Sequence, residues 1–70
     1  MTRADIDALR LRYQAACNAY HQHANRVVES SKGGETPPVA ELFAEEQALW
    51  ELAKVRRELL DGLAAAYHAR

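Results

Sequence analysis

The nine residues SSKGGETPP, from Ser30 to Pro38, contain two of the three glycines and both prolines of this 70-residue chain. Either glycine suits the left-handed backbone that often follows a helix, and Lys32 before them suits the negative end of the helix dipole. Thr36 is a favourable N-cap for a following helix, with Pro37 at its first position. The stretch therefore predicts the end of one helix and the start of another.

Both flanking segments have the composition of helices. The chain is rich in alanine, leucine, glutamate and arginine and poor in β-branched residues, which favours helix. We predict an all-α fold in one domain, residues 1–70, with a first helix over about 2–31, a turn over 32–36 and a second helix over about 37–69. The short connection makes these helices an antiparallel two-helix hairpin. Gly62 is expected on the polar, solvent-facing side.

Apolar residues recur at alternating spacings of four and three in both segments, the repeat of helices that pack at about +20°. The first row comprises Ile6, Leu9, Tyr13, Ala16, Tyr20, His23 and Val27, and the second comprises Val39, Leu42, Glu46, Leu49, Ala53, Arg56, Leu60, Leu63 and Tyr67. We expect the two rows to face each other across the hairpin. A turn centred near Gly34 places Val27 opposite Leu42.

Four residues on these rows form a predicted polar seam: His23, Glu46, Tyr13 and Arg56. In the predicted register His23 lies opposite Glu46, and Arg56 lies opposite Tyr13. We interpret the His23–Glu46 pair as a buried or half-buried polar contact that sets the register. Two alternatives are a metal site and a pH switch, since histidine binds metals and titrates near neutrality. The Glu-x-x-His spacing of metal sites in bundles is missing, so no metal and no cofactor are predicted.

The residue pattern does not indicate catalysis. His21 and His23 lie about 200° apart on a helix and cannot bind one ion from the same face. Cys17 has no orienting base on its face, so a packed thiol is expected instead of a nucleophile. The paired glycines lack the strand and lysine of a phosphate-binding loop. We therefore predict no catalytic residues and a protein that is not an enzyme.

Charge and composition also exclude several partners. The formal net charge is −1, and acidic and basic residues alternate without the basic face of a nucleic-acid-binding protein. No stretch approaches the roughly 20 apolar residues of a membrane span, and the N-terminal MTRADIDALRLRYQ lacks the apolar core of a signal peptide. A single cysteine suits a reducing compartment. These features predict a cytoplasmic protein that binds neither nucleic acid nor membranes.

The second helix carries more apolar surface than one neighbouring helix covers, because Phe43, Trp50, Leu52 and Leu59 flank its row. A two-helix hairpin lacks the second layer that stable domains need, and a core this small is marginal alone. We predict that two hairpins dimerise about a twofold axis into a four-helix bundle, with these four residues at the interface. An alternative places Trp50 in the core at the hairpin edge, but aromatic residues favour interfaces.

These properties indicate a small non-enzymatic protein-interaction module, a homodimeric helical-bundle regulator or structural adaptor. In an alternative reading the apolar face binds a different protein partner, as in an adaptor or co-chaperone, and the homodimer is a resting state. A third alternative is a bundle that binds a metal or small ligand around His23, Glu46, Tyr13 and Tyr20.

Overall fold

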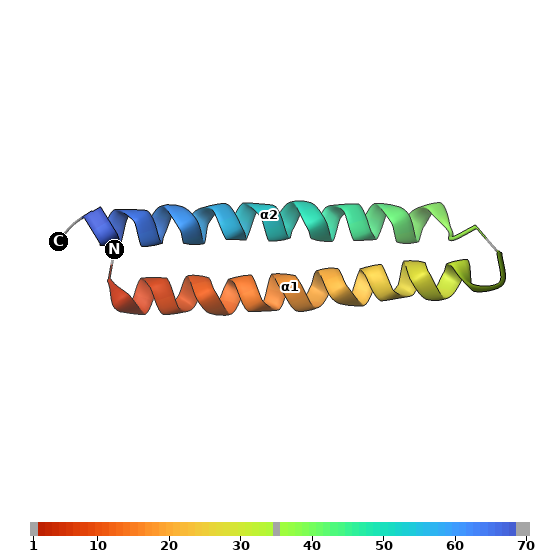
Figure 1. The fold of residues 1–70 in the computed structure, drawn as a ribbon, viewed down its shortest axis with the longest axis horizontal. Helices are drawn as coiled ribbons and strands as arrows, with labels where there is room; N and C mark the ends of the chain where they lie inside the picture. The colour runs from red at the N-terminus through yellow and green to blue at the C-terminus, as the bar shows by residue number, and fades with distance from the viewer. Residues whose placement is uncertain (1, 35, 69–70) are drawn as a thin grey trace.

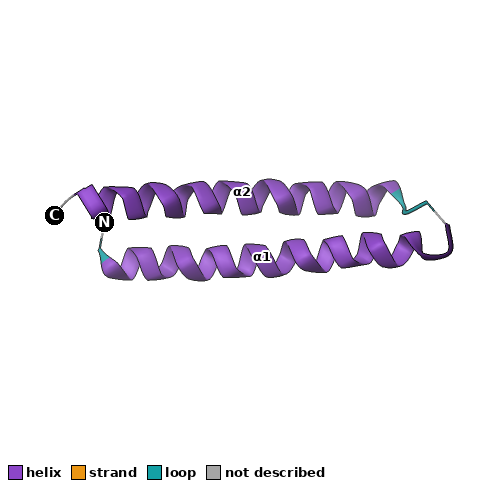
Figure 2. Cartoon of the chain, in the orientation of Figure 1, coloured by secondary structure: helices purple, strands orange, loops and turns teal. Residues whose placement is uncertain are grey.

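Two long antiparallel helices lying side by side make up the computed structural model, which describes residues 2–34 and 36–68 (Figure 1). Helix α1 spans Arg3–Ser31, a 3-10 turn spans Lys32–Gly34, and helix α2 spans Val39–His68. All regular structure in the described ranges is helical (Figure 2). The predicted all-α helical hairpin is therefore confirmed. Position 35 of the predicted turn and position 69 of the predicted second helix lie outside the described residues.

Helix α1 begins with a capping box formed by Thr2 and Asp5. The backbone N–H of Asp5 donates to Thr2 Oγ1 at 3.2 Å, and the backbone N–H of Thr2 donates to Asp5 Oδ2 at 2.9 Å. These bonds satisfy N–H groups that have no partner within the helix. The first turn of α1 is thus held by two side chains that are close in sequence and exposed.

The turn depends on left-handed backbone at two successive glycines. Both Gly33 and Gly34 have φ of +83°, a conformation that strains any residue with a Cβ atom. The expected left-handed glycine after the first helix is therefore confirmed, and both glycines adopt this conformation. Lys32 closes the last turn of α1, because its backbone N–H donates to the Glu29 carbonyl and its ammonium lies 3.0 Å from Glu29 Oε1.

Helix α2 begins at Val39, two residues later than predicted. The prediction of Thr36 as N-cap and Pro37 as the first helical residue is wrong. Pro37 precedes a second proline, and the residue before a proline is disfavoured in the helical region. Pro38 therefore occupies the N-cap position, and its carbonyl accepts a hydrogen bond from the Glu41 N–H at 3.0 Å.

The face of α1 that contacts α2 is the predicted one, since all seven residues of its row are half-buried. The predicted face of α2 is wrong, because all nine residues of its predicted row are exposed. The row that contacts α1 lies one residue earlier in the sequence. The row of α2 that faces α1, here named the inner row, comprises Glu41, Glu45, Ala48, Leu52, Val55, Leu59, Gly62 and Ala66, and Ala44 and Glu58 beside it are also half-buried. One residue corresponds to a rotation of about 100° around the helix axis.

Two cross-helix contacts define the register. Ser30 Oγ donates to Glu41 Oε2 near the turn, and Arg12 Nη1 lies 2.9 Å from Glu58 Oε2 nearer the open end of the hairpin. The predicted register would place Ser30 opposite Val39, so α2 is displaced by two residues at that point. The Arg12–Glu58 pair is on the surface and contributes less than about 1 kcal/mol.

The core between the helices is thin. Val55, at 2% exposure, is the one buried apolar side chain in the described part of the chain. Gly62 is also buried, so the prediction of a solvent-facing glycine is wrong. Its position on the inner row explains the burial, and it borders a surface hollow together with Leu9 of α1. Without a side chain at Gly62, the α2 backbone can lie against α1 there.

The depth of Val55 leads to a stability prediction. Val55→Ala removes two buried methyl groups, so we expect the free energy of unfolding to fall by about 2 kcal/mol. The matched control Val28→Ala removes the same groups from a side chain that is 59% exposed, and its effect should stay within about 0.5 kcal/mol. Urea unfolding followed by circular dichroism at one protein concentration measures both. Equal effects at the two positions would contradict this core.

The capping box leads to a pH prediction. The Thr2 backbone N–H, and secondarily the Thr2 side chain, hydrogen-bond the Asp5 carboxylate and lower its pKa from the ordinary value. A pKa lowered by folding stabilises the folded state above the unfolded-state pKa, and this stabilisation is lost as the pH falls through the folded-state pKa.

We therefore expect acid to fray the first turn of α1, and we expect Asp5→Asn to remove most of this pH dependence. Amide chemical shifts of residues 3–6 across an acid titration measure the effect. Asp7→Asn, which leaves the capping box intact, is the matched control. An unchanged acid response in Asp5→Asn would rule out the cap as its cause.

Candidate interaction surface

The hairpin exposes more surface than a compact protein of its size. It measures 55 × 14 × 14 Å with a radius of gyration of 16.0 Å, whereas a compact domain of this length has a radius of about 11 Å. Its accessible surface is 5578 Å², against about 4,400 Å² for a compact monomer of this mass. The surplus arises because each helix has only one neighbour.

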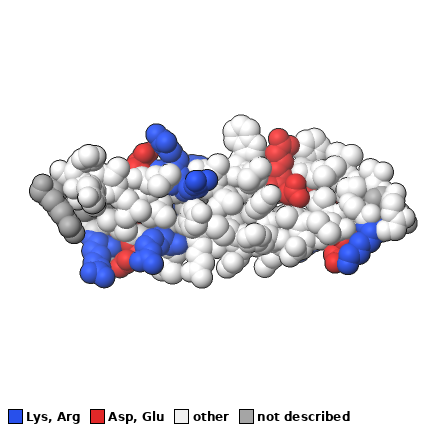
Figure 3. Space-filling view, in the orientation of Figure 1, with Lys and Arg blue, Asp and Glu red and all other residues white. Residues whose placement is uncertain are grey.

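A continuous row of exposed residues lies on one side of α2. The row predicted to face α1 is instead exposed, and we name it the outer stripe: Val39, Leu42, Glu46, Leu49, Ala53, Arg56, Leu60, Leu63 and Tyr67. Seven of its nine residues are apolar, and its four leucines are 41–49% exposed. On the face drawn in Figure 3, charged side chains gather in separate groups with wide uncharged areas between them. A continuous apolar row of this repeat is the packing surface of a helix.

The inner row and the outer stripe are offset by one residue, so they diverge by about 100° around the axis of α2. A helix in a square four-helix bundle has two neighbours at nearly a right angle. Helix α1 occupies one of these directions. The outer stripe faces the other, in which the hairpin provides no neighbour.

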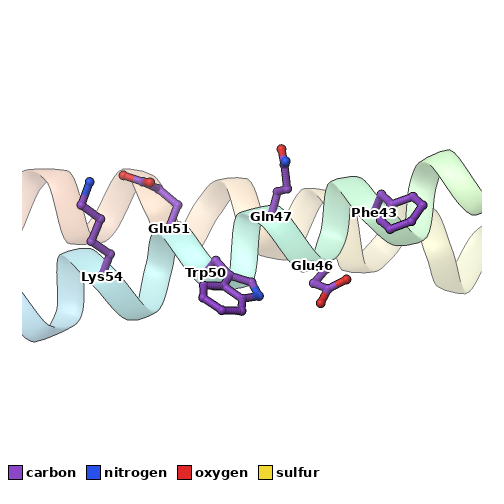
Figure 4. A pocket seen from close by; sticks show the side chains of 6 residues that line it. All are labelled: Phe43, Glu46, Gln47, Trp50, Glu51 and Lys54. Carbon is purple, nitrogen blue, oxygen red and sulfur yellow. The ribbon is translucent and has the colours of Figure 1, made fainter.

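A second exposed feature lies one position further around α2. Phe43 and Trp50 are separated by two helical turns and are 63% and 71% exposed. They border a shallow hollow together with Glu46, Gln47, Glu51 and Lys54 (Figure 4). In that view Trp50 and Glu46 project to one side of α2, while Gln47, Glu51 and Lys54 project to the other. All six residues belong to α2, so the hollow is an open surface and not an enclosed cavity.

The four predicted interface residues fall into two groups. Phe43 and Trp50 are exposed, and the alternative that placed Trp50 in the hairpin core is wrong. Leu52 and Leu59 are half-buried on the inner row, and Leu59 lines a hollow together with Tyr13 of α1. We therefore assign Leu52 and Leu59 to the contact inside the hairpin. They belong there because the inner row is one residue away from the predicted one.

The predicted polar seam is also divided. His23 and Tyr13 are half-buried on the inner side of α1, as expected, but Glu46 and Arg56 are exposed on the outer stripe. The structure therefore does not bring His23 to Glu46 or Tyr13 to Arg56. Sequence reasoning missed two acidic residues that do face α1, namely Glu41 and Glu58. An apolar repeat does not detect them, because Ser30 and Arg12 compensate Glu41 and Glu58 through polar contacts.

Other candidate chemistry is sparse. Across residues 2–34 and 36–68, no three histidine, cysteine, aspartate or glutamate side chains gather in a way that could hold a metal ion. Cys17 is a half-buried free thiol, and His21 is exposed with its ring 5.9 Å from that of Tyr20. Neither described helix is long and apolar enough to cross a membrane.

Comparisons with protein-family models, with curated proteins and with solved structures found no match to this chain. The outer stripe is therefore identified as the candidate site from its exposure, length and repeat alone. The repeat could be recognised in the sequence, but the sequence did not show that it faces away from α1.

The division of the polar seam leads to a prediction about metals. His23 and Glu46 lie on different faces of the hairpin, so we expect added zinc to leave the melting temperature of tag-free protein unchanged. Differential scanning calorimetry of the native protein and of His23→Ala, with and without zinc, measures this. A zinc-dependent rise that disappears in His23→Ala would revive the metal-site alternative.

Proposed function

We propose that the protein is a small non-enzymatic interaction module that works as a homodimer, in which two hairpins join through the outer stripe of α2 to form a four-helix bundle. The observation that carries this proposal is the exposure of seven apolar residues along the whole length of α2. Isolated monomers rarely leave a continuous apolar surface of this kind in water. A second hairpin stacked on the stripe supplies the missing layer.

The surplus surface of the whole hairpin is similar in size to the area that a stable dimer buries. The surface exceeds that of a compact monomer by about 1,200 Å², given an accessible area of 5578 Å². A specific protein–protein interface buries about 800 Å² on each partner. Burial of the stripe would therefore bring the exposed surface per residue near that of an ordinary globular protein.

As a bundle, the module would act by presenting a rigid helical surface, which is the role of a regulator or structural adaptor. We place it in the cytoplasm, because a lone half-buried thiol at Cys17 suits a reducing compartment. The exposed pair Phe43 and Trp50 favours a second candidate function. In that case the apolar surface of α2 would hold a helix of a different protein, as in an adaptor or co-chaperone.

Sedimentation and light scattering across a dilution series test the homodimer. We expect a dimer that dissociates on dilution and a melting temperature that rises with protein concentration. Leu49→Glu places a charge in the middle of the outer stripe, so it should give a monomer that keeps its helical circular dichroism. Leu11→Glu is the matched control, because Leu11 is an exposed leucine of α1 and its substitution should leave the dimer intact.

A folded native chain that stays monomeric at every concentration would refute the homodimer. The same monomer binding a different protein through the surface that contains Leu49 would support the second candidate. Equal loss of association in Leu11→Glu and Leu49→Glu would show that the outer stripe is not the interface.

A further inference from the structure

The outer stripe contains two charged residues of opposite sign, Glu46 and Arg56, and both are exposed. They lie at equal distances from a point between Leu49 and Ala53, which is the middle of the part of the stripe from Val39 to Leu63. The alternating spacing of the stripe also reads the same in both directions from that midpoint. A row with this symmetry is complementary to a second copy of itself running in the opposite direction.

We propose that the dimer packs α2 against the α2 of a second copy in antiparallel orientation, with a twofold axis between Leu49 and Ala53. Each Glu46 then pairs with the partner's Arg56. This inference rests on the homodimer proposed above and adds its orientation, its register and the contact that selects them.

The same register pairs the apolar residues of the stripe with one another. Leu49 lies opposite the partner's Ala53, and Leu42 lies opposite the partner's Leu60. Val39 lies opposite the partner's Leu63. The repeat has two kinds of position, and in an antiparallel pair of helices a residue of one kind packs opposite a residue of the other kind. The charges therefore meet each other and the apolar side chains meet apolar side chains.

Neighbouring registers lose this match. Sliding one copy by seven residues places Glu46 opposite either Leu63 or Leu49 of the partner, depending on the direction. In both cases the carboxylate enters an apolar interface without a counter-ion, which is strongly unfavourable. Arg56 is left unpaired in the same registers. The two charges thus discriminate among registers that the leucines alone would accept.

The hairpin also favours pairing of α2 with α2 over pairing of α2 with α1. Arg12 and Glu58 each lie one position before the inner side of their helix, and they meet on one side of the hairpin. The positions one residue after the inner side therefore lie together on the opposite side. On α2 these positions are the outer stripe, whereas on α1 they are Asp7, Arg10, Gln14, Cys17, His21, Ala24 and Val28. Such a mixed row is a poor partner for four leucines.

A charge exchange tests the register. Glu46→Arg or Arg56→Glu, each alone in the full chain, places like charges opposite each other twice per dimer. We expect each to raise the dimer dissociation constant about tenfold or more, because like charges in an interface are strongly unfavourable. An equimolar mixture of the two variants pairs opposite charges again, so it should associate as a heterodimer about as tightly as the native protein. Sedimentation equilibrium and native mass spectrometry measure affinity and composition.

Two exposed charges of α2 outside the stripe provide the matched control. Glu51→Arg and Lys54→Glu change the same amounts of charge, yet each alone should leave the dissociation constant nearly unchanged. Circular dichroism of every variant checks that the hairpin still folds. If the native chain dimerises but mixing does not restore association, the register is wrong while the homodimer stands. If the native chain never dimerises, the proposed function and the register both fail.

A cross-linking measurement tests the register without changing charge. In a Cys17→Ser background, one chain carries Leu42→Cys and another carries Leu60→Cys. The proposed register places these positions opposite each other, whereas two copies of position 42 lie about 27 Å apart along the axis. Oxidation should therefore give a disulfide-linked dimer only from the mixture. A linked dimer from either chain alone, or none from the mixture while the chains dimerise, would overturn the proposal.

Discussion

A single-residue offset between two rows of α2 controls the architecture of this protein. Both rows have the repeat of packed helices, and the row with smaller and more polar side chains is the one that faces α1. Alanine and glycine on that row allow a slender hairpin, 14 Å across in both short directions. Four of the six leucines of α2 lie on the other row and are exposed. The hairpin is therefore well formed as a pair of helices but incompletely covered as a domain.

The helices and the turn could be predicted from the sequence because their signals are local. Two glycines that need left-handed backbone and two adjacent prolines leave little choice at the break. The contacting face of α1 was also predictable, because α1 has one apolar row of this repeat. Only the start of α2 differed, and there the effect of Pro38 on Pro37 outweighed the preference of Thr36 for an N-cap.

The face of α2 that contacts α1 could not be predicted in the same way, because α2 carries two rows with the same spacing. Hydrophobicity favours the row of leucines, but the hairpin buries Val55 and Gly62 and compensates Glu41 and Glu58 with polar partners. Those contacts depend on the relative position of two helices and have no local signal. For the same reason Glu46 and Arg56, which were predicted at a polar seam, are exposed. Leu52 and Leu59, which were predicted at an exposed interface, lie between the two helices.

The paired glycines have a consequence for how copies of this chain can exchange parts. If the residues between the helices could become helical, α1 and α2 could join into one long helix and pair with the helices of another molecule. Such domain swapping is a low-energy route to dimers when the connecting segment can straighten. Two successive left-handed residues, followed by two prolines, oppose that straightening. The turn therefore favours the closed hairpin over an opened, domain-swapped form.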